Sequence, residues 1–181
     1  MVDELVDICD ENNNLISKKM KSVAHEFGFW HRAATIWIYN QKGEILLQLR
    51  AKDKELAPNL WDISVAGHIG SGEEPLDAAI REVREEIGLE ITKKDLKFSR
   101  IRKYSMNHGK ILNREFYYIY FLKFDGNPDD LVLQKEEVQK VRFFSTKELE
   151  TELEKHPEMF VPHGAFWQET IEDIKRIHKK E

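Results

Sequence analysis

Short blocks of apolar residues separated by polar turns run along most of the chain, and they predict strands interspersed with helices. Residues 115–124 are almost continuously apolar, which is typical of a strand that is buried on both faces. Polar turns are predicted at residues 10–14, 41–43 and 107–109, whereas the pattern of residues 15–31 favours no element. The predicted strands are residues 4–9, 33–40, 44–50, 61–66, 97–104, 115–124 and 138–144.

The clearest helix is predicted over residues 75–87. Pro75 is suited to the first turn, and Gly88 to the position just past the end. The apolar side chains that recur at helical spacing, and therefore supply the buried face, are Leu76, Ala79, Ile80, Val83 and Ile87.

Two further helices are predicted, one capped by Ser145 or Thr146 and one over residues 163–178. Strands interspersed with helices predict an α/β fold in which helices cover the faces of a mixed sheet. Because there is no repeat or low-complexity linker, we expect a single domain. Its expected parts are an N-terminal extension (1–30), a core (about 31–150) and a C-terminal helical segment (151–181).

Composition narrows the class of protein only modestly. The chain has 181 residues and a formal net charge of -5, and a pI near 5.9 argues against binding a nucleic-acid polymer. The lone Cys9 excludes an intramolecular disulfide and favours a reducing compartment. No apolar run approaches the roughly 18 residues that a membrane span needs. Because the N-terminus also lacks the features of a signal peptide, the expected location is cytoplasmic.

Three carboxylates are concentrated on the predicted helix over residues 75–87. Glu82, Glu85 and Glu86 stand at i, i+3 and i+4, which places them on one face, where like charges repel. One interpretation is a solvated acidic face that is paired with arginines, as in Arg81 with Glu85. The other is a site for a hard divalent cation, Mg²⁺ or Mn²⁺.

The loop before this helix favours the metal interpretation. Residues 67–72 contain three glycines, so the backbone can approach a ligand closely and bring bare carbonyls and amides beside the carboxylates. Glu73 precedes the helix, and a pair with Arg81 would fix the geometry of the loop.

The segment GHIGSGEEPLDAAIREVREEIGL, residues 67–89, resembles the Nudix box, the signature of Nudix hydrolases. Every specified position of that signature matches, namely Gly67, Glu73, Arg81, Glu82, Val83, Glu85, Glu86, Gly88 and Leu89. The resemblance implies a Nudix-type α/β/α sandwich with a mixed sheet. It also implies metal-dependent hydrolysis of a diphosphate linkage in a nucleoside diphosphate derivative or a related small molecule.

The resemblance also implies roles for individual residues. The expected metal ligands are Glu82, Glu85, Glu86 and the carbonyl of Gly67, and Arg81 belongs to the same catalytic motif. A general base beyond the box is expected at Glu137, before the strand VRFF. Glu136 and Glu115 remain candidates for the same role, and Glu115 is also a candidate metal ligand.

The surroundings resemble isopentenyl-diphosphate isomerase, an enzyme of the same fold. The shared features are His31-Arg32-Ala33, the run ILLQLRAKDKELAPNLWDIS and Ala66-Gly67-His68. They imply a second metal site formed by His25, His31 and His68 with Glu115.

Two departures from the isomerase favour the hydrolase. Alanine occupies position 66, where the isomerase has its catalytic cysteine, and the hydrolase box is intact. An isomerase-like enzyme and a Nudix-like domain that binds a ligand without catalysis remain alternatives.

The group attached to the diphosphate is not evident from the sequence. Arg50 and His68 are the expected substrate-binding residues. Loops over residues 51–60 and 104–113 are expected to select the substrate. We also expect a homodimer, formed through residues 1–30.

Overall fold

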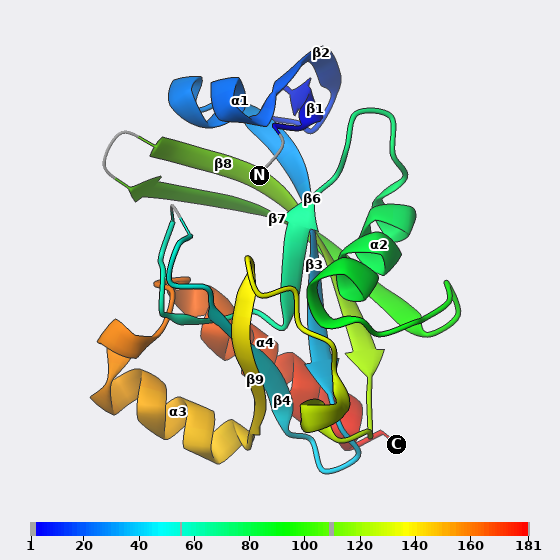
Figure 1. The fold of residues 1–181 in the computed structure, drawn as a ribbon, viewed down its shortest axis with the longest axis vertical. Coiled ribbons are helices and arrows are strands. Elements are labelled where there is room, and N and C mark those ends of the chain that lie inside the picture. Colours follow the sequence, from blue (N-terminus) through cyan, green and yellow to red (C-terminus); the bar gives the residue numbers. More distant parts are fainter. Residues whose placement is uncertain (1–2, 55, 109–110, 181) are drawn as a thin grey trace.

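A computed structural model describes residues 3–54, 56–108 and 111–180, and Figure 1 shows their arrangement. The helices are α1 (Lys21–Phe27), α2 (Pro75–Ile87), α3 (Thr146–Lys155) and α4 (Ala165–His178), with short 3₁₀ turns at Pro128–Asp130 and Pro157–Met159. The strands are β1 (Leu5–Cys9), β2 (Leu15–Met20), β3 (Trp30–Tyr39), β4 (Ile45–Arg50), β5 (Trp61–Asp62), β6 (Val65–His68), β7 (Leu96–His108), β8 (Ile111–Lys123) and β9 (Val138–Phe144).

These strands form one mixed sheet in which β3 is central. β8 runs parallel to β3 along the whole strand, whereas β4, β6 and β1 pair with β3 in the antiparallel sense. β7 pairs with β8, β9 and β5 pair with β4, and β2 pairs with β1. The predicted mixed sheet and the hairpin of β3 and β4 are therefore confirmed.

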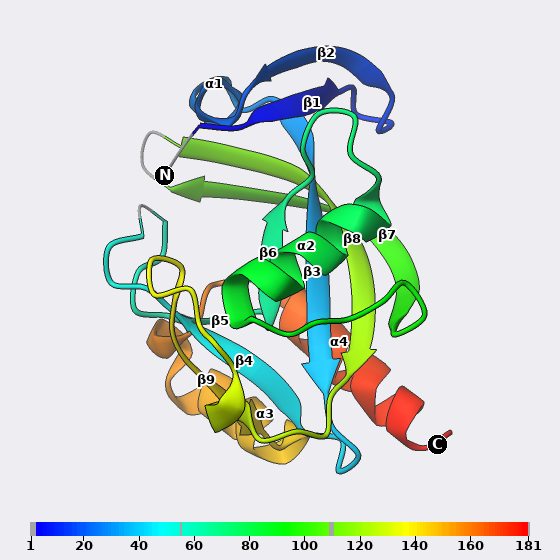
Figure 2. The same ribbon diagram turned by 45° about the vertical axis from the view of Figure 1, so that its right-hand side comes forward.

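Helices cover both faces of the sheet, so the predicted α/β/α arrangement is also confirmed (Figure 2). Successive side chains of a strand point to opposite faces. On β3, Ile36 and Ile38 pack into the apolar cluster under α2, and Trp37 and Tyr39 into the cluster under α4. Side chains of β3 belong to both clusters, so apolar packing on its two faces holds the central strand rigidly in place.

Helix α2 has the predicted bounds, and the signals that predicted it act as expected. Pro75 begins the helix, and Gly88 ends it with a left-handed φ of 67° and an amide that donates to the carbonyl of Arg84. Helix α3 is capped by the hydroxyl of Ser145, which accepts from the amide of Glu148 at 3.1 Å.

The prediction of one strand over 61–66 followed by a loop from Gly67 is wrong in detail. The segment divides into β5 and β6, and β6 continues through Gly67 and His68, which pair with Ala34 and Ala33. The interruption has a physical cause, since the hydroxyl of buried Ser64 accepts from the amide of Ile38 at 2.8 Å. This polar contact replaces strand pairing at the point where the chain changes partners.

The expected loop over 104–113 is also corrected. β7 and β8 remain paired as far as His108 and Ile111, and Tyr104 pairs with Glu115. Polar side chains in this part of the hairpin hid the strands from a hydrophobicity pattern. The turn predicted at 107–109 is wrong at Asn107 and His108, which belong to β7, and Gly109 lies outside the described residues.

The N-terminal extension and the C-terminal segment both pack on the body. Residues 15–31, for which no element was predicted, contain β2 and α1. The hydroxyl of Ser71, in the loop before α2, donates to Asp7 of β1 at 2.7 Å. Helix α3 crosses the expected boundary at residue 150, and α4 contributes to the same core as β3.

None of the helices in the described ranges is both long and apolar enough to cross a membrane.

Candidate active site

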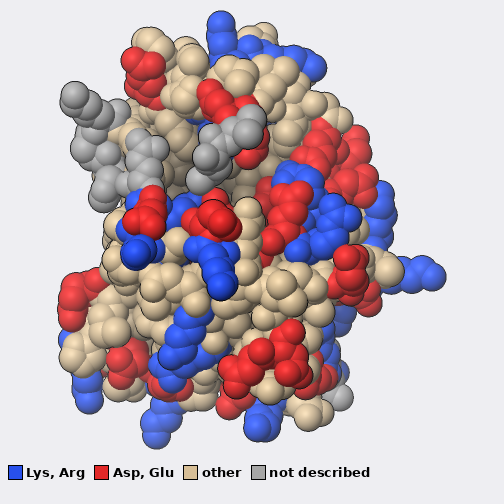
Figure 3. All heavy atoms as spheres, in the orientation of Figure 1, with Lys and Arg blue, Asp and Glu red and all other residues tan. Residues whose placement is uncertain are grey.

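A cavity of about 280 Å³ opens beside α2 and collects side chains from both ends of the chain. It is lined by the end of β4, residues 51–60, β5 and β6, part of β8, and the segment before α4. On the surface in Figure 3, acidic and basic side chains alternate over α2 and the loop before it. The predicted site residues that line the cavity are His25, Arg50, Gly67, His68, Arg81, Glu82, Glu85, Glu86, Glu115 and Glu137.

The three glutamates of α2 share one face, but they differ in burial. Glu82 and Glu86 are 8% and 5% exposed, because this part of α2 turns toward the sheet. The side chain of Glu85 is 45% exposed, so it lies at the mouth of the cavity. The sequence placed the three on one face, but it did not distinguish the two buried carboxylates from the exposed one.

Arg81 connects the helix to the loop before it. Its guanidinium forms a two-pronged pair with Glu73, with both N–O distances at 2.9 Å, and donates to the carbonyl of His68 at 3.0 Å. It also contacts Glu82 at 2.6 Å and Glu85 at 3.2 Å. The expected pair of Glu73 and Arg81 is thus present, and Arg81 is fully occupied in holding the loop and the helix together.

The buried carboxylates of α2 are short of positive charge. Burial raises the pKa of Glu82 to about 7, even though Arg81 opposes the shift. Burial also raises the pKa of Glu86 well above its usual value, and the negative charges of Glu82 and Glu137 add to the effect. The only side-chain donor to Glu86 within the described residues is the amide of Gln48, at 3.1 Å. The cluster would therefore gain stability from a cation.

Gly67 is required by close approach of the backbone to this cluster. A Cβ atom built on Gly67 would lie 2.0 Å from Cδ of Glu82, which no side chain tolerates. The glycine therefore allows a backbone segment to lie directly against the carboxylate. Carboxylate and carbonyl oxygens are the donors that Mg²⁺ and Mn²⁺ prefer, so the residues present fit such an ion.

Of the two glutamates before β9, only Glu137 lines the cavity. It forms a close ion pair with Lys54 of residues 51–60, and both side chains are largely buried. Its charge is felt by Glu86, as the raised pKa of that residue indicates. Glu136 is exposed on the surface. The structure thus brings Glu137, and not Glu136, to the carboxylates of α2.

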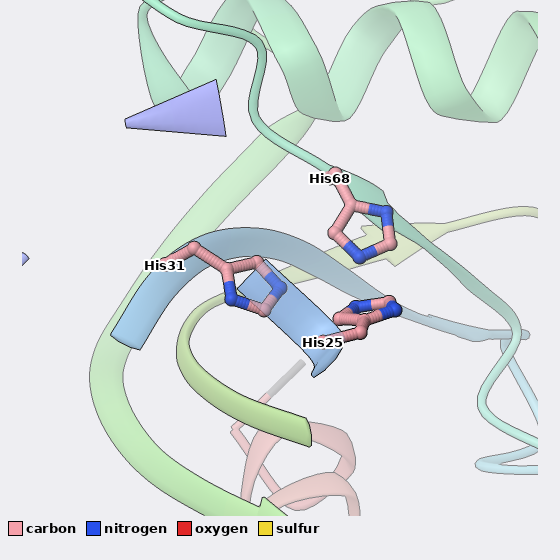
Figure 4. Close-up of side chains that lie close together, drawn as sticks. All are labelled: His25, His31 and His68. Atoms are coloured by element: carbon pink, nitrogen blue, oxygen red, sulfur yellow. The ribbon is translucent and has the colours of Figure 1, made fainter. Parts of the chain in front are cut away.

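Three histidines from three different elements converge beside the cavity (Figure 4). His25 of α1, His31 of β3 and His68 of β6 have ligand atoms that all lie within 4.8 Å of one another. Nε2 of His31 and Nε2 of His68 lie 3.5 Å and 3.4 Å from Oε1 of Glu115. The structure therefore assembles the four residues that the resemblance to the isomerase grouped together.

The hydrogen bonds of this cluster leave ring nitrogens directed inward. Nδ1 of His31 donates to the carbonyl of Phe29 at 2.9 Å, so Nε2 is the ring nitrogen that faces Glu115. Burial lowers the pKa of His68 well below its usual value. Burial opposes ionisation of Glu115, but a hydrogen bond from His31 and the neighbouring histidines lower its pKa to about 2. Imidazole nitrogens beside a carboxylate are ligands that fit a transition-metal ion.

Several residues of the cavity were not singled out from the sequence. Asp62 and His163 line it and contact each other at 2.6 Å, although they stand 101 positions apart. A charged residue inside the apolar run around Trp61 and Ile63 was the available signal for Asp62. Nothing in the local pattern marked His163. The remaining unpredicted polar residues of the lining include Glu4, Lys21, Asn113, Tyr117 and Gln134.

Comparisons with known proteins agree with this geometry. The NUDIX domain family model matches residues 29–163. An uncharacterized Nudix hydrolase of Clostridium acetobutylicum is 36% identical over 141 residues, covering 76% of this chain and 68% of that protein. The isopentenyl-diphosphate Delta-isomerase of Serratia proteamaculans is 32% identical over 159 residues, or 88% and 86% of the two chains.

A solved structure shows the same fold over nearly the whole chain. A protein from Deinococcus radiodurans superposes with a TM-score of 0.68 at 20% sequence identity, covering 96% of this chain and 98% of that one. Its coverage includes the N-terminal extension and the C-terminal helix, which lie outside the family model.

Proposed function

Because the chain belongs to the NUDIX domain family, a family of hydrolases that act on acid anhydrides, we propose that it is a divalent-metal-dependent pyrophosphohydrolase. Its substrate is a nucleoside diphosphate derivative or a related small molecule. The observation that carries the proposal is the pair of buried, under-neutralised carboxylates, Glu82 and Glu86, against Gly67 in the wall of a cavity.

In this proposal the carboxylates of Glu82, Glu85 and Glu86, with the carbonyl of Gly67, hold Mg²⁺ or Mn²⁺. The ion supplies neutralisation of the diphosphate and a lower pKa for the attacking water. Arg81 keeps the loop and the helix in register through its contacts with Glu73 and the carbonyl of His68.

The remaining residues of the lining act on the substrate and the water. Arg50 and His68 contact the substrate, and Lys54 adds positive charge near the phosphates. Glu137 accepts a proton from the attacking water, and its position beside Glu86 supports it over Glu136. Glu115 is the alternative base, although its contacts with His31 and His68 favour a role in the histidine cluster.

We also propose that His25, His31 and His68, with Glu115, form a second metal site. The separations of the ligand atoms and the carboxylate of Glu115 beside them support it. This cluster, and the identity to isopentenyl-diphosphate isomerases, also support the second candidate function, an isomerase-like enzyme. Ala66 lines the cavity where the isomerase requires a thiol, which weighs against that candidate.

A substrate panel tests the proposal. The protein is incubated with nucleoside diphosphate derivatives, dinucleotides and prenyl diphosphates, with Mg²⁺, with Mn²⁺ and with a chelator. We expect release of phosphate or a monophosphate only when metal is present. Double-bond migration without phosphate release would establish the isomerase instead, and metal-dependent binding without turnover would establish a non-catalytic domain.

The cytoplasmic location and the homodimer remain predictions. Size-exclusion chromatography with light scattering tests the dimer, which is expected at twice the mass of the 21.4 kDa chain.

A further inference from the structure

A second buried polar network lines the same cavity, and Arg50 is its only member with a role in the proposed function. Asp62 Oδ1 lies 2.6 Å from Nε2 of His163, and Asp62 Oδ2 accepts from Arg50 at 2.9 Å. The hydroxyl of Tyr104 lies 3.1 Å from Nδ1 of His163. Asp62 and His163 are 5% and 7% exposed, and both face the cavity. We refer to Arg50, Asp62, His163 and Tyr104 as the Asp62 network.

The donors and acceptors of the Asp62 network match one another. The carboxylate of Asp62 also accepts from the amide of Ile63 at 2.8 Å, so it receives donors on both oxygens. An ionised carboxylate can only accept, and Nε2 of His163 must therefore carry a hydrogen. The hydroxyl of Tyr104 meets the other ring nitrogen, Nδ1, and completes the network. Such a network is rigid, because moving one member leaves another buried group without a partner.

Arg50 extends the network into residues 51–60. Its Nε donates to the carbonyls of Leu56 and Ala57, both at 3.1 Å, and its Nη2 donates to Leu56 at 2.9 Å. Leu56 and Ala57 line the cavity themselves. Asp62 thus holds one side of the guanidinium while the other side holds the loop.

The loop needs such a restraint, because its backbone is strained. Ala57 and Asn59 have φ values of 48° and 59°, a left-handed conformation that residues with a side chain seldom adopt. Arg50 binds at Ala57, and Gln139 donates to the side chain of Asn59 at 2.7 Å. Both strained positions are therefore held from outside the loop.

We propose that Asp62 and His163 are positioning residues that fix Arg50 and thereby make Lys54, Leu56 and Ala57 a preformed wall of the substrate cavity. The same wall carries Lys54 to its ion pair with Glu137. The role in catalysis rests on the proposed function. Among the described residues, no hydrogen bond links the network to Glu82, Glu85 or Glu86, and the charge of Arg50, which acts on Glu86, is retained when His163 is changed. Loss of the network therefore raises KM for a diphosphate substrate and leaves metal binding intact.

Four variants separate this role from a general structural one. His163→Leu removes the donor to Asp62, whereas His163→Gln can restore it. Tyr104→Phe removes the outer contact with Nδ1 and the contact of the hydroxyl with Met106 at 3.5 Å, but leaves the pair of Asp62 and His163 in place. Asp173→Asn is the matched control, because Asp173 pairs with Arg100 at 2.5 Å on α4, outside the cavity.

The first readout is amide hydrogen exchange at Arg50, Ala51 and Lys54. The amides of Arg50 and Ala51 donate to Leu60 and Glu137. We expect exchange in this loop to accelerate about tenfold or more in His163→Leu, and to stay near wild type in His163→Gln, Tyr104→Phe and the control.

The second readout is calorimetric binding of methylenediphosphonate in the presence of Mn²⁺, compared with Mn²⁺ alone. We expect His163→Leu to weaken the diphosphonate about tenfold and to leave Mn²⁺ binding unchanged. With a substrate from the panel, the same variant should raise KM and spare kcat.

Unchanged loop exchange in a folded His163→Leu protein would overturn the proposal, as would loop loosening without weaker diphosphonate binding. The proposal would also be overturned if His163→Gln did not restore both loop exchange and diphosphonate binding. If His163→Leu does not fold, Asp62→Asn replaces it. This variant removes the anion that holds Arg50 and leaves Arg50 itself in place, so the same two changes are expected. Absence of hydrolysis by the wild type contradicts the proposed function alone, because the exchange readout needs no substrate.

Discussion

The cavity contains two groups of buried carboxylates that have the same exposure and opposite electrostatics. Glu82 of α2 is 8% exposed and has a pKa raised to about 7, whereas Asp62 is 5% exposed and has a pKa lowered to about 2. Burial raises the pKa of both residues. At Asp62, contacts with His163, Arg50 and the amide of Ile63 outweigh the effect of burial and lower the pKa. Among the described side chains, Glu82 accepts only from Arg81.

The difference separates a binding role from a structural role. A buried carboxylate with a hydrogen-bond donor on each oxygen holds its neighbours in place, as Asp62 holds Arg50 and His163. Carboxylates whose charge is not balanced destabilise the fold until a cation arrives, and such groups are characteristic of functional sites. Variants of the two kinds of carboxylate should therefore behave differently.

The largest expected effect is on catalysis. Glu86→Gln keeps the shape of the side chain and its contact with Gln48, but removes the charge that faces a metal ion. We expect kcat/KM to fall about 100-fold or more while the protein stays folded. Steady-state kinetics with a substrate from the panel measures the loss. Glu85→Gln should behave in the same way, and near wild-type activity in both variants would exclude the assigned metal site.

The next largest effect is on stability. Asp62→Asn leaves Arg50 and His163 without their shared anion, and we expect it to lower the free energy of unfolding by about 3 kcal/mol. Urea denaturation with chelator present measures this loss. Glu86→Gln is the contrasting variant, and under the same conditions it should stabilise the protein. Equal destabilisation by both substitutions would abolish the distinction between the two groups.

Gly67→Ala tests the close approach of the backbone to α2. The added Cβ would meet the carboxylate of Glu82 at 2.0 Å, so either β6 or the side chain must shift. We expect a loss of about 1–3 kcal/mol in stability together with weaker Mn²⁺ binding. Gly72→Ala is the control for backbone strain in the same loop, because its φ of 80° disfavours a side chain although no atom lies within 4 Å of a Cβ at that position. Unchanged Mn²⁺ affinity in Gly67→Ala would contradict the role of this contact.

The smallest effect is a dependence of stability on pH. The folded pKa of Glu82, about 7, lies above the usual value of 4.5, so the folded state binds this proton more tightly. Stability is therefore lost as the pH rises from about 4.5 to about 7. Glu82→Gln removes this loss. Its stability relative to wild type should grow by about 1 kcal/mol or more over that range, measured with chelator present. A constant difference would mean that Glu82 is not destabilised by its charge.

Much of the fold could be predicted because it depends on local patterns. The bounds of α2 followed from Pro75, Gly88 and the apolar spacing between them, and most strands followed from short apolar runs. The failures have a common cause, since β2 and the outer parts of β7 and β8 carry exposed or polar side chains. There the backbone pairing of neighbouring strands decides the structure, and hydrophobicity gives no signal.

The candidate site likewise has one part that the sequence predicted and one part that it did not. The carboxylates of α2 lie within one contiguous motif, so spacing and resemblance were sufficient to find them. Asp62 and His163 meet only because β5 and the segment before α4 lie side by side, where Val161 donates to the carbonyl of Trp61 at 2.9 Å. Each residue is unremarkable in its own stretch of sequence. The positioning network was therefore visible only in three dimensions.

The central claim is that the carboxylates of α2 are built to receive a divalent cation. The most direct test is calorimetric titration of the chelator-treated protein with Mn²⁺ at pH 6, in buffers that differ in ionisation enthalpy. Because Glu82 has a pKa raised to about 7 and is largely protonated at pH 6, binding should release about one proton per ion, and less at pH 9. The proton release should diminish in Glu82→Gln. Mn²⁺ binding without proton release at pH 6, or no binding at either pH, would contradict the account.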